Sequence, residues 1–439
     1  MNKYDVVILG NNMNSLICAS LLATCNISVG LFSFAAEEGN GITFPLQYSW
    51  DASRGAMAYF LESLKMDNSS LVRAEQVVDQ LIFRDFQITR PTGWFNYRDL
   101  LISLYGEEKE NLLFYFDEIN SLGEEWIELL KADSIFQVKN IKKTLQYRNI
   151  TYNDFVVELF SSSSLKQILL SDLPRDNVSL TVMAGYLSTQ VFDYHSLTGG
   201  VSRFRLALIE YLNERAVDLH LGEYVQKVTQ EEEDSYLIHL KSRKIQAENI
   251  ISTWDEPETF NACSMEYSRI EKALVETGNS SLILSLVMKE SYNFTPWGEG
   301  FRVRLFDVKN LPLIPSHPID IYIDREERTL DIYFPDFDRE LSAETQVELI
   351  LAEIDKRYSV LPCIKKRNLI QRDDWALFRG ISRERLNQWA FLPDEMKTNP
   401  FNQQFEYKNF YTTGRWGGAW FTSAIAATRE LLKSLHPRS

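Results

Sequence analysis

The sequence has few of the residues that mark metal centres or disulfide frameworks. Its 439 residues include four cysteines and five histidines. The cysteines form no C-x-x-C pair, the spacing typical of zinc sites and redox disulfides. The histidines have no metal-ligand spacing and no cluster of cysteines or carboxylates around them. We therefore expect free or buried thiols in a reducing compartment, which predicts a cytoplasmic protein without a metal site.

Positive charge is also scarce, with 46 Lys and Arg against 61 Asp and Glu and a formal net charge of −15. Nucleic acids and anionic membrane surfaces both require a positively charged protein face. The composition thus argues against both as partners. The most apolar stretch, residues 16–34, is divided by Asn26 and Gly30 into a helix and a strand, so no integral membrane segment is expected. Residues 1–5 lead directly into a strand, so no secretory signal is expected either.

What the sequence does have is length and aromatic side chains. A chain of 439 residues is too long for one compact core, and predicts two domains. Aromatic residues make up 13% of the chain. They either fill large cores or line an apolar cavity between the domains. Trp94 and Tyr97 leave both interpretations open, because they suit core packing and also the wall of a substrate pocket.

The two ends of the chain carry the patterns most informative about function. Residues 4–9 are a mostly apolar run that ends at Gly10, typical of a strand buried on both faces. A buried helix over 13–24 and a strand over 27–32 complete the start of a doubly wound sheet. Residues 409–429 predict a short strand, a glycine-bracketed turn and a helix of small residues. Such a helix start directs unpaired N–H groups at an anion such as a pyrophosphate.

Between these ends the sequence predicts two further kinds of segment. Residues 107–190 are mainly helical, with Thr151 or Asn153 as a helix cap. The other expected elements are helices at 55–66, 201–213 and 343–357, and strands at 81–89, 94–97, 217–221, 224–229, 235–240, 245–252, 280–289, 300–307, 319–324 and 329–334.

The order of these segments predicts an α/β protein whose domains are interleaved. Residues 1–60, 196–258 and 405–439 form one nucleotide-binding domain in this interpretation. Residues 61–195 and 259–404 form a second, α+β domain, with an antiparallel sheet and a helical cap.

Four motifs, taken in order, resemble the flavin-dependent amine oxidase and phytoene desaturase superfamily. They are the opening strand at 4–10, a Gly-Gly turn into a helix at 196–208, the strand and turn at 250–257, and the C-terminal turn at 409–429. Relatives include protoporphyrinogen oxidase, UDP-galactopyranose mutase and the flavin-free Rab GDP-dissociation inhibitors. The resemblance implies a Rossmann-like FAD-binding domain, and a substrate domain that places a small organic molecule at the domain interface.

The same resemblance implies which residues contact FAD. The backbone of Val225 would meet the adenine, and the turn from Gly414 to Ala419 would lie under the pyrophosphate and the flavin. Arg415 stands where many members have an acid, and this form is similar to the mutase branch; Arg also pairs well with phosphate. Arg54 lies where the family chain passes near the flavin, although capping or a surface role suits it equally. The expected cofactor-binding residues are Gly10, Asn12, Asn14, Ser15, Ser33, Arg54, Val225, Gly414, Arg415, Trp416 and Ala419. No catalytic residue can be identified.

The N-terminal loop departs from the Rossmann fingerprint, which uses three glycines for a tight turn, close approach to the pyrophosphate and helix packing. Only Gly10 remains. Asn12 takes the approach position, where its side chain occupies space the pyrophosphate would use, and Ser15 takes the packing position. Ser33 stands in place of the acid that binds ribose hydroxyls, unless an acid at 37–38 replaces it.

Three functions therefore follow from the sequence. The first is an FAD-dependent oxidoreductase. The second is a flavin-free binding protein on the same fold, with a protein partner in the manner of the GDP-dissociation inhibitors. The third, suggested only by Arg415, is a mutase-like flavin isomerase.

Overall fold

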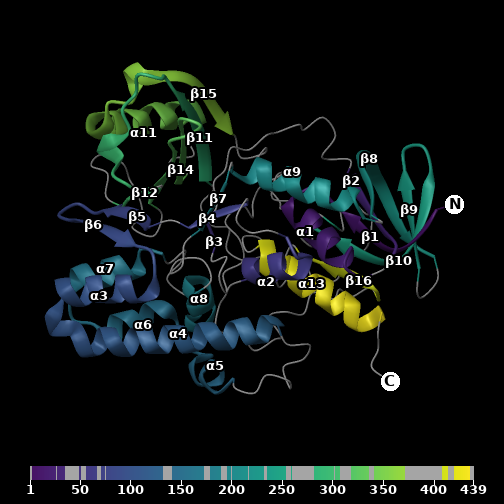
Figure 1. Cartoon of the computed structure of the whole chain (residues 1–439), viewed down its shortest axis with the longest axis horizontal. Helices are drawn as coiled ribbons and strands as arrows, with labels where there is room; N and C mark the ends of the chain where they lie inside the picture. Colours follow the sequence, from purple (N-terminus) through teal and green to yellow (C-terminus); the bar gives the residue numbers. More distant parts are fainter. Residues whose placement is uncertain are drawn as a thin grey trace.

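The computed structural model describes most of the chain. The described residues are 2–25, 27–34, 49–50, 56–66, 71–74, 76–131, 141–172, 178–188, 195–198, 200–215, 217–231, 235–253, 259, 281–300, 302–306, 318–335, 341–370, 408–413 and 420–435. Figure 1 shows two sheets near opposite ends of the long axis, each with helices packed against it. The fold is therefore a mixed arrangement of helices and sheets.

The first sheet has six strands and draws them from distant parts of the sequence. They are β1 (Lys3–Leu9), β2 (Val29–Phe34), β8 (Val217–Gln230), β9 (Tyr236–Leu240), β10 (Lys244–Ser252) and β16 (Phe410–Thr412). Strands β8, β2, β1, β10 and β16 pair in parallel, in that order. Strand β9 pairs antiparallel with both β8 and β10. The described strands thus come from residues 3–34, 217–252 and 410–412, while the domain boundaries remain a prediction.

Both faces of this sheet are covered, as the apolar run of β1 predicted. Val6 and Ile8 belong to a core shared with four helices. Val7 and Leu9 belong to a second core on the opposite face. The four helices are α1 (Met13–Leu22), α2 (Ala56–Leu64), α9 (Gly200–Asn213) and α13 (Trp420–Leu435). All ten residues of α1 are buried, so the helix has no polar stripe.

Strand β8 differs from the prediction of two strands. It is continuous, but its pairing with β2 shifts register between Phe32 and Ser33. Phe32 pairs with His220 and Ser33 with Tyr224, so residues 221–223 bulge away from β2. The small and polar residues at this bulge led to the wrong prediction of a strand break.

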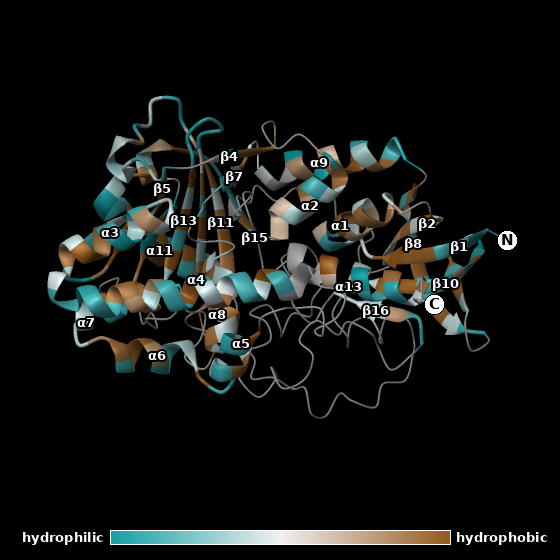
Figure 2. Cartoon of the chain, turned by 60° about the horizontal axis from the view of Figure 1, so that its bottom comes forward, coloured by the Kyte–Doolittle hydropathy of each residue, from teal (hydrophilic) through white to brown (hydrophobic). Residues whose placement is uncertain are grey.

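The second sheet has seven strands, in the order β15, β11, β14, β13, β12, β5, β6. Their bounds are β5 (Val77–Ile82), β6 (Gln87–Pro91), β11 (Ser281–Met288), β12 (Arg302–Leu305), β13 (Ile319–Asp324), β14 (Thr329–Pro335) and β15 (Ile364–Ile370). All neighbours are antiparallel except β12 and β5. One face packs its apolar residues on α11 (Ala343–Tyr358). Figure 2 shows the hydrophobic residues along these strands. A smaller sheet contains β3 (Ser49–Trp50), β4 (Val72–Ala74) and β7 (His195–Leu197).

A layer of helices lies beside the second sheet (Figure 1). It consists of α3 (Trp94–Leu104), α4 (Lys109–Lys131), α5 (Lys142–Tyr147), α6 (Tyr152–Leu159), α7 (Ser163–Leu170) and α8 (Leu180–Tyr186). The Thr151 side chain accepts a hydrogen bond from Asp154 N and caps α6, which confirms the predicted cap. Short 3₁₀ turns lie at Gly106–Glu108, Thr295–Trp297 and Leu361–Cys363. In the described part of the chain, no helix is long and apolar enough to cross a membrane.

The predicted strand at 94–97 is wrong, because these residues open α3. Trp94, Tyr97 and Leu101 are the buried residues of that helix, and they recur at helical spacing. Gly93, with φ of 97°, separates the helix from β6. A short aromatic segment suits either structure, and the longer apolar period decides in favour of the helix.

Candidate functional site

The carboxyl ends of the parallel strands meet at one edge of the six-stranded sheet. Gly10 N donates to Phe32 O at 2.8 Å, Thr253 N to Leu9 O at 2.9 Å, and Thr413 N to Ser252 O at 2.9 Å. The chain leaving β1 therefore lies beside the chain leaving β10 and β16. This is the edge at which doubly wound sheets bind their ligands. The structure brings the N-terminal loop close to the start of the C-terminal turn.

Gly10 has the backbone geometry that the first fingerprint position requires. Its φ is 124°, in the region that favours glycine, and the residue is buried. The chain can thus turn sharply from β1 into α1. This part of the fingerprint is intact.

Asn12 is the N-cap of α1, and both ends of its amide are hydrogen-bonded. Its Oδ1 accepts from Ser15 N at 3.2 Å, and its Nδ2 donates to Thr253 O at 3.0 Å. The Ser15 hydroxyl donates in turn to Asn12 O at 2.6 Å. The Asn12 side chain therefore binds one of the helix donors that an anionic ligand would use. At this position the chain caps its own helix.

Asn14 joins the two ends of the chain. Its Nδ2 donates to Thr413 Oγ1 at 3.0 Å, across 399 residues of sequence, and Thr413 directly precedes Gly414. The other amide atom, Asn14 Oδ1, is buried and has no hydrogen-bond partner among the described residues. Buried polar atoms are nearly always paired in native proteins. Asn14 Oδ1 is thus placed to accept a hydrogen bond from a ligand hydroxyl or N–H group.

Arg205 on α9 also reaches the N-terminal loop. Its Nη2 donates to Asn11 Oδ1 at 2.5 Å, and its Nη1 to Asn11 O at 3.3 Å. A guanidinium therefore lies beside the N-terminus of α1, where it adds to the positive potential of the helix end. Arg205 is not among the residues predicted from the sequence. Its only signal is a charge on the polar face of a helix that follows a Gly-Gly turn.

The position expected to bind ribose has no carboxylate. Ser33 is fully buried, and its hydroxyl donates to Leu221 O at 2.8 Å within the bulge of β8. Val225 lies next to it, pairs with Phe34 and Leu240, and has its side chain in the apolar core. Their cofactor contacts stay predictions. Arg54, Gly414, Arg415, Trp416, Ala419 and residues 37–38 lie outside the described residues, so their roles stay predictions too.

Other residues singled out in the sequence have structural roles. Trp94 and Tyr97 pack edge-on against Phe116, with ring centroids 4.8 and 5.8 Å apart, which confirms core packing. Searched over the described residues, His, Cys, Asp and Glu form no group of three that could hold a metal ion.

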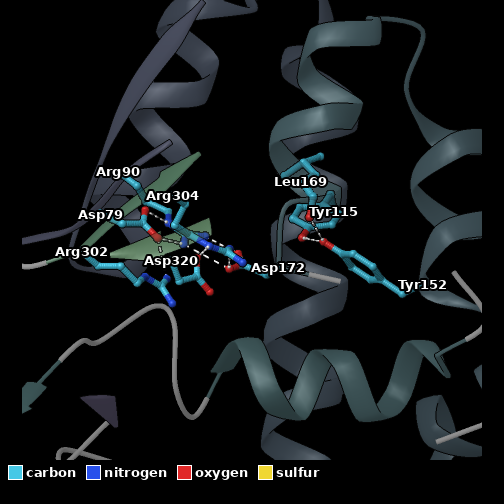
Figure 3. Close-up of polar contacts among 9 residues, drawn as sticks. All are labelled: Asp79, Arg90, Tyr115, Tyr152, Leu169, Asp172, Arg302, Arg304 and Asp320. Carbon is cyan, nitrogen blue, oxygen red and sulfur yellow. Dashed lines mark hydrogen bonds and ion pairs between the residues drawn. The ribbon is translucent and has the colours of Figure 1, made fainter. Parts of the chain in front are cut away.

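Figure 3 shows a buried ionic cluster at the seven-stranded sheet. Its residues Arg302 and Arg304 alternate along β12 with Val303 and Leu305 of the core with α11, so the cluster lies on the opposite face of the sheet. Arg90 binds Asp79 at 2.9 and 2.5 Å and also binds Asp172. Arg302 binds Asp79 at 2.5 Å. Arg304 binds Asp172 at 2.8 Å and Asp320 at 2.7 Å. We call these six residues the Asp–Arg cluster: Asp79, Arg90, Asp172, Arg302, Arg304 and Asp320.

The Asp–Arg cluster is balanced in charge and holds the fold together. Burial alone would raise the pKa of Asp172, but Arg90 and Arg304 outweigh it and lower that pKa to about 2. The pKa of Asp79 is also held below its usual value, because Arg90 and Arg302 outweigh its burial. Asp172 follows α7, so the cluster ties the helical layer to strands of the sheet. With three arginines bound to three aspartates, it has no excess charge for a ligand.

Comparison with known proteins shows what fold this is. No family model and no curated protein sequence matches the chain. Among solved structures, putrescine oxidase bound to putrescine aligns over 99% of both chains, at 14% identity and a TM-score of 0.62. Cyclohexylamine oxidase from Brevibacterium oxydans aligns over 99% of both, at 13% identity and 0.60. An oxidoreductase from Methanosarcina mazei covers 98% of this chain and 100% of its own, at 14% identity and 0.61.

These likenesses extend over almost the whole chain, while the sequence identities are very low. They show that the chain has the fold of these oxidases. The likeness is one of fold alone, and it agrees with the mixed helix and sheet architecture expected from the sequence.

Proposed function

We propose that this protein is an FAD-dependent oxidoreductase that binds its cofactor at the carboxyl edge of the six-stranded sheet. It would oxidise a small organic substrate between the six-stranded and the seven-stranded sheet. The observation that carries the proposal is the bond from Asn14 to Thr413, which joins the loop after β1 to the start of the C-terminal turn. Asn14 Oδ1 is left as a buried acceptor at that junction. The shared fold of the oxidases supports the same assignment.

The residues at this edge fit a dinucleotide in its phosphate and flavin half. The N-terminus of α1 and the Arg205 guanidinium supply positive potential for phosphates. Asn14 Oδ1 would accept a hydrogen bond from a hydroxyl of the cofactor. In this proposal Arg415 also binds phosphate, and Trp416 and Ala419 lie against the flavin, as the resemblance implies.

The same edge offers less to the adenosine half. The Ser33 hydroxyl is already bound to Leu221 O, and no described carboxylate stands at the ribose position. At the phosphates, the amide of Asn12 already caps α1. We therefore expect binding to depend on the phosphate and flavin half, with an affinity below that of a site with the full glycine fingerprint.

The chemistry would come from the cofactor, because a bound flavin accepts two electrons from an organic substrate. The chain's part is to bind, to orient and to exclude water. The seven-stranded sheet and the helical layer would provide the surface that receives the substrate. Since two proteins of this fold are a putrescine oxidase and a cyclohexylamine oxidase, amines are the first substrates to assay.

Reconstitution with flavin tests this proposal. The full chain is purified, incubated with excess FAD and desalted, and the bound flavin is quantified by absorption after denaturation. We expect flavin to be retained in stoichiometric amount. Matched samples of Asn12→Gly and Arg205→Ala should bind more tightly and less tightly, respectively. A protein that retains no flavin under any of these conditions is not a flavoprotein.

One observation favours the flavin-free alternative. Both polar atoms of the Asn12 amide are hydrogen-bonded within the chain, so the loop is stable without any phosphate. A binding protein of this kind would remain colourless after reconstitution and would have a protein partner. The mutase-like function rests on Arg415, outside the described residues. Turnover of a nucleotide sugar with reduced flavin would be its signature.

A further inference from the structure

Asp331 lies in the middle of β14, on the face of the seven-stranded sheet that is turned away from α11. Its direct neighbours across the strands are Tyr322 on β13 and Ser285 on β11. Directly opposed residues of a sheet share one face. Leu330 and Ile332, the residues on either side of Asp331, belong to the core with α11. Asp331 therefore points away from that core.

This face is turned towards the helices of the six-stranded sheet. Tyr333 and its cross-strand neighbour Ile283 lie one pleat along the strands from Asp331. Ile283 belongs to the core built by α1, α2, α9 and α13, and Tyr333 packs against it. Asp331 thus lies close to the junction of the two sheets, on the side where the proposed function places the substrate.

The other buried acids of this face are bound by arginines, whereas Asp331 is bound by no arginine among the described residues. It is 1% exposed, and its Oδ1 has no hydrogen-bond partner among the described residues. The Ser285 hydroxyl forms a hydrogen bond with the carboxyl, and the charged group that acts on it through space is Asp324, another acid. Burial accordingly raises the pKa of Asp331 to about 7. The nearby arginines Arg302 and Arg304 bind Asp79, Asp172 and Asp320.

An acid is a costly residue at such a position unless it binds something. A buried carboxylate without a cation is strongly unfavourable, and an apolar or amide side chain would pack there at lower cost. The missing partner is positively charged, because a carboxylate oxygen accepts hydrogen bonds and attracts cations. Tyr322 and Tyr333 flank the acid, with ring centroids 5.1 Å apart, and aromatic rings attract organic cations.

We propose that Asp331 binds the ammonium group of an amine ligand on this face of the sheet, and so determines the charge of the substrate that the protein accepts. The ligand is taken to be the substrate of the proposed oxidoreductase, and in that respect the inference rests on the proposed function. The binding step itself requires only Asp331 and its surroundings.

Equilibrium binding to the full chain tests the inference. The probes are putrescine and n-butylamine, with 1-butanol as a neutral control, titrated at pH 8 by calorimetry. We expect the wild type to bind the amines, and Asp331→Asn to bind them at least tenfold more weakly. Asp85→Asn removes an exposed acid and should leave amine binding unchanged. Amine affinity within twofold of the wild type in Asp331→Asn, or no amine binding by the wild type at millimolar concentration, would overturn the inference.

The pH dependence of the wild type provides a second measurement that needs no variant. Amine affinity should rise between pH 6 and pH 8, as Asp331 loses its proton. By strand register, the other titratable or charged groups on this face close to Asp331 are Tyr322, Asp320 and Asp324 on β13, Tyr333 on β14, Arg302 and Arg304 on β12, and Lys366 on β15. Burial raises the pKa of Tyr322 above its usual value, so this tyrosine stays protonated throughout that range. An affinity that does not change from pH 6 to pH 8 would contradict the assignment.

Flavin content, measured on the same samples, separates this inference from the proposed function. Amine binding that depends on Asp331 in a protein without flavin supports the inference and refutes the oxidoreductase. Retained flavin together with amine binding that is independent of Asp331 refutes the inference alone.

Discussion

Asn12 and Asp331 are both buried polar side chains at places where a ligand is expected, and they differ in how their polar atoms are satisfied. Asn12 uses both ends of its amide, on Ser15 N and Thr253 O. Asp331 has an oxygen without a partner among the described residues, and its charged neighbour is another acid. A satisfied group stabilises the protein by itself, while an unsatisfied one costs stability until something binds. The loop at Asn12 is therefore stable without a ligand, whereas a ligand that binds Asp331 would stabilise the protein.

In the Asp–Arg cluster the buried charged groups are paired with one another. Removing one of them should therefore lower the free energy of unfolding more than any other change considered. Arg90→Ala would leave Asp79 and Asp172 buried with one arginine fewer each. Removal of one partner from a buried ion pair costs about 3–5 kcal/mol, so we expect a loss of that size in the free energy of unfolding. Urea denaturation measures it. The control Arg98→Ala breaks an exposed pair with Asp99 and should cost about 1 kcal/mol or less. Equal losses in both variants would contradict a structural role for the cluster.

Asp331→Asn should act in the opposite direction and depend on pH. The folded-state pKa of about 7 lies above the unfolded value, so the folded protein holds this proton more tightly. Asp331 therefore lowers stability progressively as the pH rises from about 4 to about 7, and the full cost remains above that range. A difference of about three pKa units corresponds to about 4 kcal/mol. We expect Asp331→Asn to raise the free energy of unfolding by about 2–4 kcal/mol at pH 8 and to leave it unchanged at pH 4. A variant less stable at pH 8 than the wild type would show that Asp331 is already paired.

Arg205→Ala tests whether the loop after β1 binds phosphate. A hydrogen bond to a charged group contributes about 1.5–3 kcal/mol, so FAD affinity should fall by roughly 10- to 100-fold. Fluorescence titration with FAD gives the dissociation constant. Arg215→Ala, two residues beyond the end of the same helix and with its guanidinium over the Tyr211 ring, is the matched control and should not change it. Unchanged affinity in Arg205→Ala would remove Arg205 from the site.

Asn12→Gly should have the smallest effect on stability. Glycine at an N-cap costs only a few tenths of a kcal/mol relative to asparagine. The change frees Ser15 N and the space of the side chain, so FAD affinity should rise by roughly tenfold, or about 1.4 kcal/mol. Ser162→Gly removes the cap of α7, away from this edge, and should leave FAD affinity unchanged. A fall in affinity would mean that the Asn12 amide is itself a ligand for the cofactor.

The sequence predicted the elements whose pattern is local. The apolar run of β1, the turn at Gly10 and the buried helix α1 follow from neighbouring residues, because burial on both faces leaves a continuous apolar segment. The C-terminal strand and helix follow in the same way. The strand predicted at 94–97 was wrong, because four residues are too few to separate a period of two from one of 3.6.

The sites could be predicted less well, because their contacts are distant in sequence. The bond from Asn14 to Thr413 spans 399 residues, and the one from Arg302 to Asp79 spans 223. Each depends on which strands become neighbours. Asp331 lies on a strand that alternates apolar and polar residues, a pattern typical of a sheet with one face in water. Only the structure shows that its polar face is buried.

Flavin content is the measurement that tests the account most directly. The absorption spectrum of the freshly purified full chain is recorded before and after incubation with FAD and desalting. We expect the absorption bands of an oxidised flavin, with about one flavin per chain after reconstitution. A colourless protein that retains no flavin, also when Asn12 is replaced by glycine, would contradict it.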